Sequence, residues 1–110
     1  MEITEDQRSD VLILRVIGKL DASTSKDLET KLLSHIAANR GKLLLDLSQL
    51  DYISSAGLRV FLLAAKRMDE AKGKMVLCSL KDGVKQVFDI AGFSSFLTLA
   101  GSTEEAIKDL

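Results

Sequence analysis

Cysteine, histidine and proline are scarce or missing in this chain, and each absence limits what the protein can be. With one cysteine, Cys78, the chain cannot form an internal disulfide, and with one histidine, His35, it has no cysteine and histidine cluster for zinc. Cys78 lies in the apolar run MVLCSL, which predicts a buried, unreactive thiol. The absence of proline agrees with compact, regular elements.

An excess of charge of either sign is also missing. The net charge of -1 comes from 15 basic and 16 acidic residues interspersed along the chain, which indicates no basic surface for a nucleic acid or an anionic membrane. No run approaches the roughly 18 apolar residues that span a bilayer, and the acidic segment MEITEDQRSD lacks the apolar centre of a signal peptide. We therefore expect a cytoplasmic protein with no direct nucleic-acid partner and no membrane span.

What the chain does have is a regular alternation of apolar patterns. Its 110 residues, 46% of them hydrophobic, suffice for one domain over residues 1–110. The order β-β-α-β-α-β-α-β-α predicts an α/β fold with a mixed, mainly parallel sheet of about five strands flanked by four helices. The expected strands are 2–5, 11–18, 42–48, 74–80 and 95–100, and the expected helices are 24–39, 55–72, 81–92 and one that begins at Ser102.

Three of these helices begin at a serine or threonine that can cap them. Thr24 with Asp27 and Ser102 with Glu105 have the spacing of capping boxes. Ser54 is placed as an N-cap whose hydroxyl accepts a hydrogen bond from one of the first free backbone N–H groups. These signals predict the helix starts more sharply than the apolar spacing does.

The small residues Ser54, Ser55, Ala56 and Gly57 stand between a strand and the helix 55–72, where they exceed the needs of a tight turn. Ser55 takes the first helical position, from which its side chain can point toward solvent. Gly57 costs the helix about 1 kcal/mol relative to alanine unless another group approaches its backbone closely. In open α/β sheets, functional residues concentrate just outside the carboxyl ends of the strands, and we expect the serine segment to lie at this edge of the sheet.

Two aspartates are expected at the same edge. Asp21 follows the second strand and Asp46 lies late in the third, so both carboxylates are candidates for a shared site. Aspartates near strand ends are more often turn formers than acid and base catalysts. We therefore predict no catalytic pair from them.

The residues alone leave three interpretations of the serine segment open. It can be a structural cap, a phosphorylation switch on Ser55, or the site of a nucleophile. A helix N-terminus favours a phosphate by about 0.3 to 1 kcal/mol, so the switch is physically reasonable. A hydrolase is disfavoured because the leading glycine of G-x-S-x-G is missing and His35 lies upstream of Ser55. No phosphate-binding glycine loop occurs, and we predict that the chain is not an enzyme.

The helix that follows carries two further candidates. Leu58, Phe61 and Met68 share a face that should pack on the sheet. Leu63 falls outside this apolar arc, so we expect it to be exposed and treat it as a candidate partner contact. Arg59 lies four residues after Ser55 on the same helix face and could pair with a phosphate there.

Three long segments of the chain resemble the STAS domain of stand-alone bacterial anti-sigma-factor antagonists. They are GKLDASTSKDLETKL, LLLDLSQLDYISSAGLRVFL and GKMVLCSLKDGVKQVFDIAGF, and the resemblance covers essentially the whole chain. In that family the central motif typically reads aromatic-apolar-Asp-Ser-Ser/Thr-Gly-Leu. The serine after the Asp is phosphorylated by a partner that is both an anti-sigma factor and a serine kinase.

The resemblance assigns roles to residues of this chain. It places Ser55 on the phosphoacceptor and Ser54 on the Asp, which leaves Ser54 as a rival acceptor. Ala56 falls on the Ser/Thr, and the GKLD stretch carries Asp21 over as a residue close to the site. The residues expected to contact the partner are Asp21, Ser54, Ser55, Ala56, Gly57, Leu58, Arg59 and Leu63.

The function that the resemblance implies is partner switching. The unphosphorylated protein would bind the anti-sigma factor and so release the sigma factor, and phosphorylation of Ser55 would block that binding. ATP and Mg²⁺ would belong to the kinase, a serine phosphatase would reset the switch, and the chain itself would hold no cofactor or metal. The alternative is a STAS scaffold or complex subunit that is never phosphorylated.

Overall fold

The computed structural model of the chain describes residues 1–39, 41–92 and 97–110. Its elements follow the predicted order, and a short strand, β4, is added between β3 and α2. The strands are β1 (Glu2–Arg8), β2 (Val11–Leu20), β3 (Lys42–Asp46), β4 (Leu50–Ile53), β5 (Lys74–Cys78) and β6 (Thr98–Ala100). The helices are α1 (Ser25–Ala37), α2 (Ser55–Glu70), α3 (Asp82–Ile90) and α4 (Thr103–Asp109). Residues 95 and 96 of the predicted last strand lie outside the described residues.

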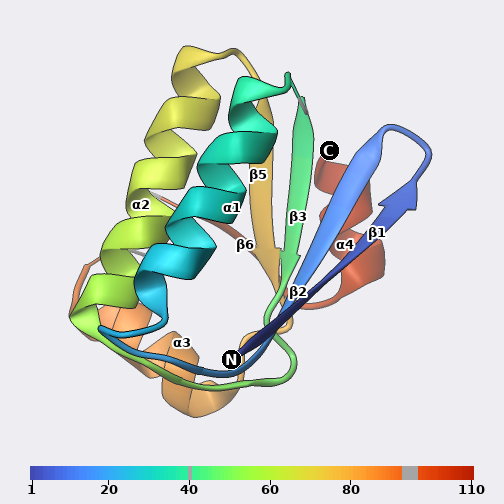
Figure 1. Cartoon of the computed structure of the whole chain (residues 1–110). Helices are drawn as coiled ribbons and strands as arrows, with labels where there is room; N and C mark the ends of the chain where they lie inside the picture. The colour runs from blue at the N-terminus through green and yellow to red at the C-terminus, as the bar shows by residue number, and fades with distance from the viewer. Residues whose placement is uncertain (40, 93–96) are drawn as a thin grey trace.

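The sheet is mixed and mainly parallel, as predicted. Its strand order is β1-β2-β3-β5-β6, with β1 antiparallel to β2 and the other neighbours parallel. Helices α1 and α2 lie side by side on one face of the sheet, and α4 lies on the other (Figure 1). Helix α3 packs against β4 at the end of the sheet where α2 begins. No helix among the described residues has the length and apolar character needed to cross a membrane.

Two apolar cores hold these layers together. The larger one lies between the sheet and α1, α2 and α3, and includes Phe61 and Phe88, whose ring centroids are 6.0 Å apart. The smaller one lies under α4 and includes Cys78 and Ala106. Cys78 is buried, as predicted. Burial raises the pKa of its thiol, and the reactivity of the thiol is therefore low.

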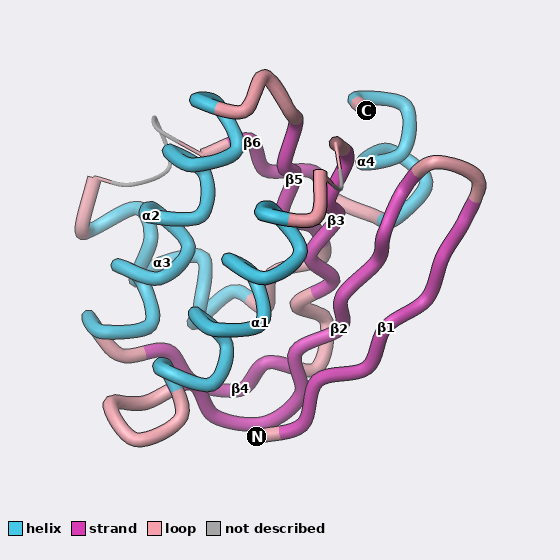
Figure 2. Tube along the Cα trace, turned by 45° about the horizontal axis from the view of Figure 1, so that its top comes forward, coloured by secondary structure: helices cyan, strands magenta, loops and turns pink. Residues whose placement is uncertain are grey.

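Strand β2 is long because it changes partners along its length. It pairs with β3 from Leu12 to Arg15 and then with β4 from Gly18 to Leu20. At the change the register shifts, and Gly18 adopts a φ of 100°, which a residue with a side chain rarely does. Figure 2 shows β4 beside the end of β2 that leads to α1. The shift carries Leu20 to the start of α2.

The turn between β3 and β4 is built on a buried carboxylate. One oxygen of Asp46 accepts a hydrogen bond from the Ser48 N–H at 3.0 Å, and the other accepts one from Arg15 Nε at 3.0 Å. Burial opposes the charge of Asp46, but these hydrogen bonds outweigh it and its pKa lies below the usual value. Asp46 pairs with Arg15, six residues and about 20 Å before Asp21 along β2. The expectation that Asp46 shares an edge with Asp21 is therefore wrong.

The structure confirms one of the two side-chain caps that were predicted for α4 and α1. Ser102 Oγ accepts from the Glu105 N–H at 3.2 Å, and the Glu105 carboxylate accepts from the Gly101 N–H at 3.0 Å, so that cap is confirmed. Thr24 precedes α1 but does not cap it with its side chain. Its hydroxyl donates to the Lys19 carbonyl at 3.1 Å and accepts from a backbone N–H in the preceding turn. The predicted side-chain cap at Thr24 is wrong because this hydroxyl is used by the end of β2.

The predicted close approach at Gly57 is confirmed. A Cβ added to Gly57 would lie 2.8 Å from two atoms of Leu20 and 3.0 Å from Ile53 Cγ1. The side chains of β2 and β4 therefore occupy the space next to the first turn of α2. An ordinary side chain at this position would push the helix away from both strands.

We predict that Gly57→Ala destabilises the protein although alanine is the better helix former. Overpacking costs about 1 to 3 kcal/mol, and over most of this range the cost outweighs the gain of about 1 kcal/mol in helix propensity. Gly83 in α3 has nothing within 4 Å of an added Cβ, so Gly83→Ala is the matched control and should stabilise by up to about 1 kcal/mol. Urea unfolding of both variants measures the difference. Equal effects of the two substitutions would contradict the close packing.

Candidate functional site

The candidate site lies where β2 and β4 end and α2 begins. The Ser54 N–H donates a hydrogen bond to the Leu20 carbonyl at 2.9 Å, which joins the two strand ends. Asp21 follows Leu20 directly, and Ser55 follows Ser54. The structure therefore brings together two of the predicted features, Asp21 and the serine segment.

Ser54 is the N-cap of α2, as predicted. Its backbone is extended, with φ of -92° and ψ of 171°, and its Oγ accepts a hydrogen bond from the Gly57 N–H at 3.2 Å. The side chain is half-buried. The Ser54 hydroxyl is therefore turned toward the helix backbone and committed to a structural role.

Ser55 is the first residue of α2 and is exposed to solvent. Ala56 is half-buried, while Gly57 and Leu58 are buried. Gly57 and Leu58 thus support the surface from below, and a partner can reach little of them. Of the predicted contact residues on this helix, Ser55 and Arg59 are the exposed ones.

Asp21 forms a turn beside the serine segment. Its Oδ1 accepts hydrogen bonds from the Ser23 hydroxyl at 2.7 Å, the Ser23 N–H at 3.0 Å and the Thr24 N–H at 3.1 Å. The bond from the Ser23 hydroxyl, followed by the backbone bonds, lowers the pKa of Asp21 below its usual value. Asp21 therefore places a fixed negative charge at this edge at neutral pH.

The prediction that Leu63 is exposed is wrong. Leu63 is half-buried, and α1 packs beside α2, the helix that carries it. The helical projection of α2 by itself leaves out the neighbouring helix α1. Leu63 thus offers a partner at most a partial contact.

Sequence reasoning missed Tyr52 as a candidate contact. This tyrosine lies on β4, is 51% exposed and pairs across the strands with Lys19. It stands three residues before Ser55, within the motif that carries the family resemblance. The available signal was a large aromatic side chain two residues before the first serine, since exposed tyrosines are common anchors of protein interfaces.

His35, the one histidine of the chain, lies away from Ser55. His35 lies ten residues beyond the start of α1, about 15 Å along the helix, and its Nε2 is 2.5 Å from Glu5 Oε1 on β1. The histidine therefore pairs with the hairpin strand rather than with Ser55. Within residues 1–39, 41–92 and 97–110, no group of three histidine, cysteine, aspartate or glutamate side chains could hold a metal.

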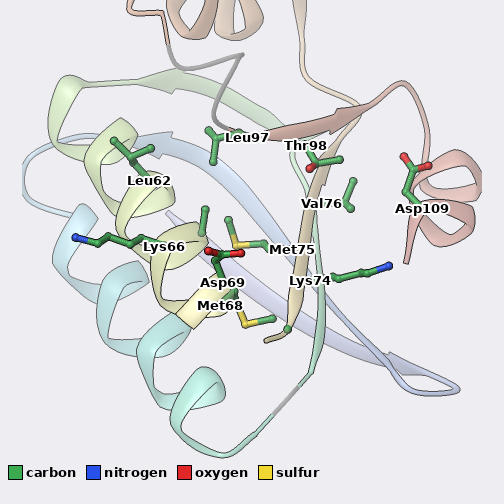
Figure 3. Close-up of a pocket in the computed structure, with 12 residues that line it drawn as sticks. Leu62, Lys66, Met68, Asp69, Lys74, Met75, Val76, Leu97, Thr98 and Asp109 are labelled. Atoms are coloured by element: carbon green, nitrogen blue, oxygen red, sulfur yellow. The ribbon is translucent and has the colours of Figure 1, made fainter. Parts of the chain in front are cut away.

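A groove of about 520 Å³ lies away from this site, beside the C-terminal half of α2. Figure 3 shows its lining, with Lys66 and Asp69 from α2, Met75 from β5 and Asp109 from α4. Lys66 is eleven residues beyond Ser55, about 16 Å along the helix axis. The carboxylates of Asp69 and Asp109 lie on opposite sides of β5, so they form no acid and base pair.

Comparison with known proteins identifies the family. The STAS domain family matches residues 2–106. The chain belongs to the STAS domain family. It is 42% identical over 106 residues to the candidate anti-sigma factor antagonist BtrV of Bordetella bronchiseptica, with 96% of this chain and 91% of BtrV covered.

Solved structures of anti-sigma factor antagonists have the same fold. A candidate anti-sigma factor antagonist from Thermotoga maritima aligns with a TM-score of 0.92 at 19% identity, covering 97% of this chain and 92% of that one. The Bacillus protein SpoIIAA aligns in its phosphorylated form with a TM-score of 0.75 at 18% identity, covering 98% of each chain. These neighbours confirm the fold predicted from the sequence.

We predict that the two adjacent serines contribute unequally to stability. Ser54→Ala should lower the free energy of unfolding by about 1 kcal/mol, because it removes the oxygen that accepts from the Gly57 N–H. Ser55→Ala should change it by less than about 0.5 kcal/mol, since Ser55 is exposed and alanine favours the helix. Urea unfolding measures both variants. A loss at Ser55 as large as that at Ser54 would contradict the assignment of the cap.

Proposed function

We propose that this protein is an anti-sigma factor antagonist whose partner binding is controlled by phosphorylation of Ser55. The unphosphorylated form binds an anti-sigma factor that is also a serine kinase, and the sigma factor is released. The observation that carries the proposal is the exposed Ser55 hydroxyl at the start of α2, held beside Asp21 by the bond from Ser54 to Leu20. BtrV, which is 42% identical to this chain, is named as a candidate anti-sigma factor antagonist, and this supports an anti-sigma factor as the partner.

The geometry favours Ser55 over Ser54 as the phosphoacceptor. The Ser54 oxygen accepts from the Gly57 N–H and is half-buried, whereas Ser55 is exposed. A kinase that modified Ser54 would have to displace this capping bond first, at a cost of about 1 kcal/mol in helix stability. Modification of Ser55 leaves the cap in place.

The chemistry belongs to the partner, and this chain is its substrate. Ser55 Oγ attacks the γ-phosphorus of ATP bound by the kinase with Mg²⁺, the bond from that phosphorus to ADP breaks, and a base of the kinase accepts the hydroxyl proton. The products are phosphoserine and ADP. A serine phosphatase hydrolyses the phosphoserine and restores the binding form.

Phosphorylation can act on affinity without changing the fold. The phosphoryl group adds about -1.5 to -2 charges at the centre of the proposed surface, next to the ionised Asp21. An interface that excludes water must leave this charge unpaired or rearrange, and a hundredfold loss of affinity requires only about 2.8 kcal/mol. The positive end of α2 tolerates the phosphate, so we expect little change in the helix itself.

We predict that the cognate kinase phosphorylates the protein at Ser55. After incubation with the kinase and ATP, mass spectrometry of the digested protein should find one phosphate, located on Ser55. Ser54→Ala should still be modified, and Ser55→Ala should not. Phosphate on Ser54 alone, or on neither serine, would contradict the assignment.

We predict that Ser55→Asp binds the anti-sigma factor at least about tenfold more weakly than Ser55→Ala, because it places a permanent charge in the docked surface. Ser34→Asp, an exposed serine on α1 away from the site, is the matched control and should bind as the unmodified protein does. Titration calorimetry with the purified partner measures the affinities of the three variants and of the unmodified protein. Equal binding by Ser55→Asp and Ser55→Ala would reject charge as the switch. A stable assembly that forms whatever the state of Ser55 would favour the scaffold alternative.

A further inference from the structure

Arg59 is an uncommitted cation on the same face of α2 as Ser55. It follows Ser55 by four residues, one helical turn or about 6 Å along the axis. Arg59 is exposed, and no carboxylate among the described residues forms an ion pair with it. Its guanidinium is therefore available to a negative group that arises at Ser55.

Other cations around the site are engaged or differently placed. Lys81 at the start of α3 pairs with Asp51 on β4, and Arg67 pairs with Glu70 at 3.8 Å within α2. Lys19 is exposed at the end of β2, on the strand that leads to Asp21. Lys19 is thus one rival cation for a charge at Ser55, and it lies on a different element.

We propose that the Arg59 guanidinium binds the phosphoryl group of phosphorylated Ser55, an inference that rests on the function proposed above. An acidic group four residues before a basic one is the favourable order on a helix, and arginine pairs with phosphate through two parallel N–H groups. The phosphate is then held against α2 and away from the ionised Asp21.

This pairing gives phosphorylation a second effect. In the unphosphorylated protein Arg59 is an open positive group on the proposed docking surface, available to an acidic residue of the partner. In the phosphorylated protein the same guanidinium is occupied within its own helix. One modification therefore adds negative charge at Ser55 and withdraws a positive contact one turn away.

The test uses full-length protein in which phosphoserine is installed at position 55 during translation, so no kinase is needed. A pH titration followed by ³¹P NMR gives the second pKa of the phosphate. Arg59→Gln should raise this pKa by at least about 0.3 unit, because the cation no longer favours the doubly ionised form. Arg59→Lys should keep part of the shift, and in about 1 M salt the difference should shrink.

The matched controls are Lys66→Gln and Lys19→Gln. Lys66 is exposed on the same helix but eleven residues from Ser55, so Lys66→Gln should leave the phosphate pKa unchanged. Lys19→Gln should have a smaller effect than Arg59→Gln. Because Arg59 and Lys66 are both exposed, we expect both variants to unfold at the temperature of the unsubstituted phosphoprotein.

Two results would overturn the pairing. One is an Arg59→Gln phosphate pKa equal to that of Lys66→Gln, and the other is a larger shift in Lys19→Gln than in Arg59→Gln. The proposed function fails separately, if the kinase leaves Ser55 unmodified. The encoded phosphoserine reports on Arg59 in either case.

Discussion

The hydrogen bond from the Ser54 N–H to the Leu20 carbonyl is the contact on which the arrangement of the site depends. It joins the last residue of β2 to the cap of α2, so the two segments that follow, at Asp21 and Ser55, emerge at one edge. The absence of a side chain at Gly57 lets the first turn of α2 lie against Leu20 and Ile53. If a side chain at position 57 kept α2 away from Leu20 and Ile53, Ser54 could not both cap the helix and continue the pairing of β4 with β2.

This contact requires β2 to leave β3 before it ends. The register shift after Gly18, with its φ of 100°, lets one strand pair first with β3 and then with β4. Strand β4 in turn starts from the turn that Asp46 holds through Ser48 and Arg15. The site is therefore positioned by backbone geometry and by an ion pair whose carboxylate is buried, rather than by the residues that are exposed in it.

The features that could be predicted from the sequence are local ones. The caps at Ser54 and Ser102 depend on a hydroxyl and a backbone N–H three residues apart, which the sequence alone places. The close approach at Gly57 was predictable for a related reason, since a glycine in a first helical turn needs an explanation. The alternation of strands and helices likewise follows from the apolar spacing within each segment.

The features that could not be predicted depend on distant segments. The Thr24 hydroxyl fails to cap α1 because its partner is the Lys19 carbonyl, and Leu63 is half-buried on a helix that packs beside α1. Strand β4 has four residues of which two are exposed, too short a pattern to separate from a loop. For Ser55, the residues alone left a cap, a switch and a nucleophile open, and the family resemblance chose the switch.

The structure also gives a physical account of Ser54, which stands where the resembling family often has an aspartate. Serine and aspartate are about equally good N-caps, so the capping bond to the Gly57 N–H survives the replacement. What is lost is a negative charge directly next to the proposed phosphoacceptor. On the proposed function, a phosphate on Ser55 would meet one fewer like charge, and Asp21 would remain as the fixed carboxylate at the edge. Phosphorylation would therefore cost the helix less in this chain, and the change in charge that a partner meets would come from the phosphate itself.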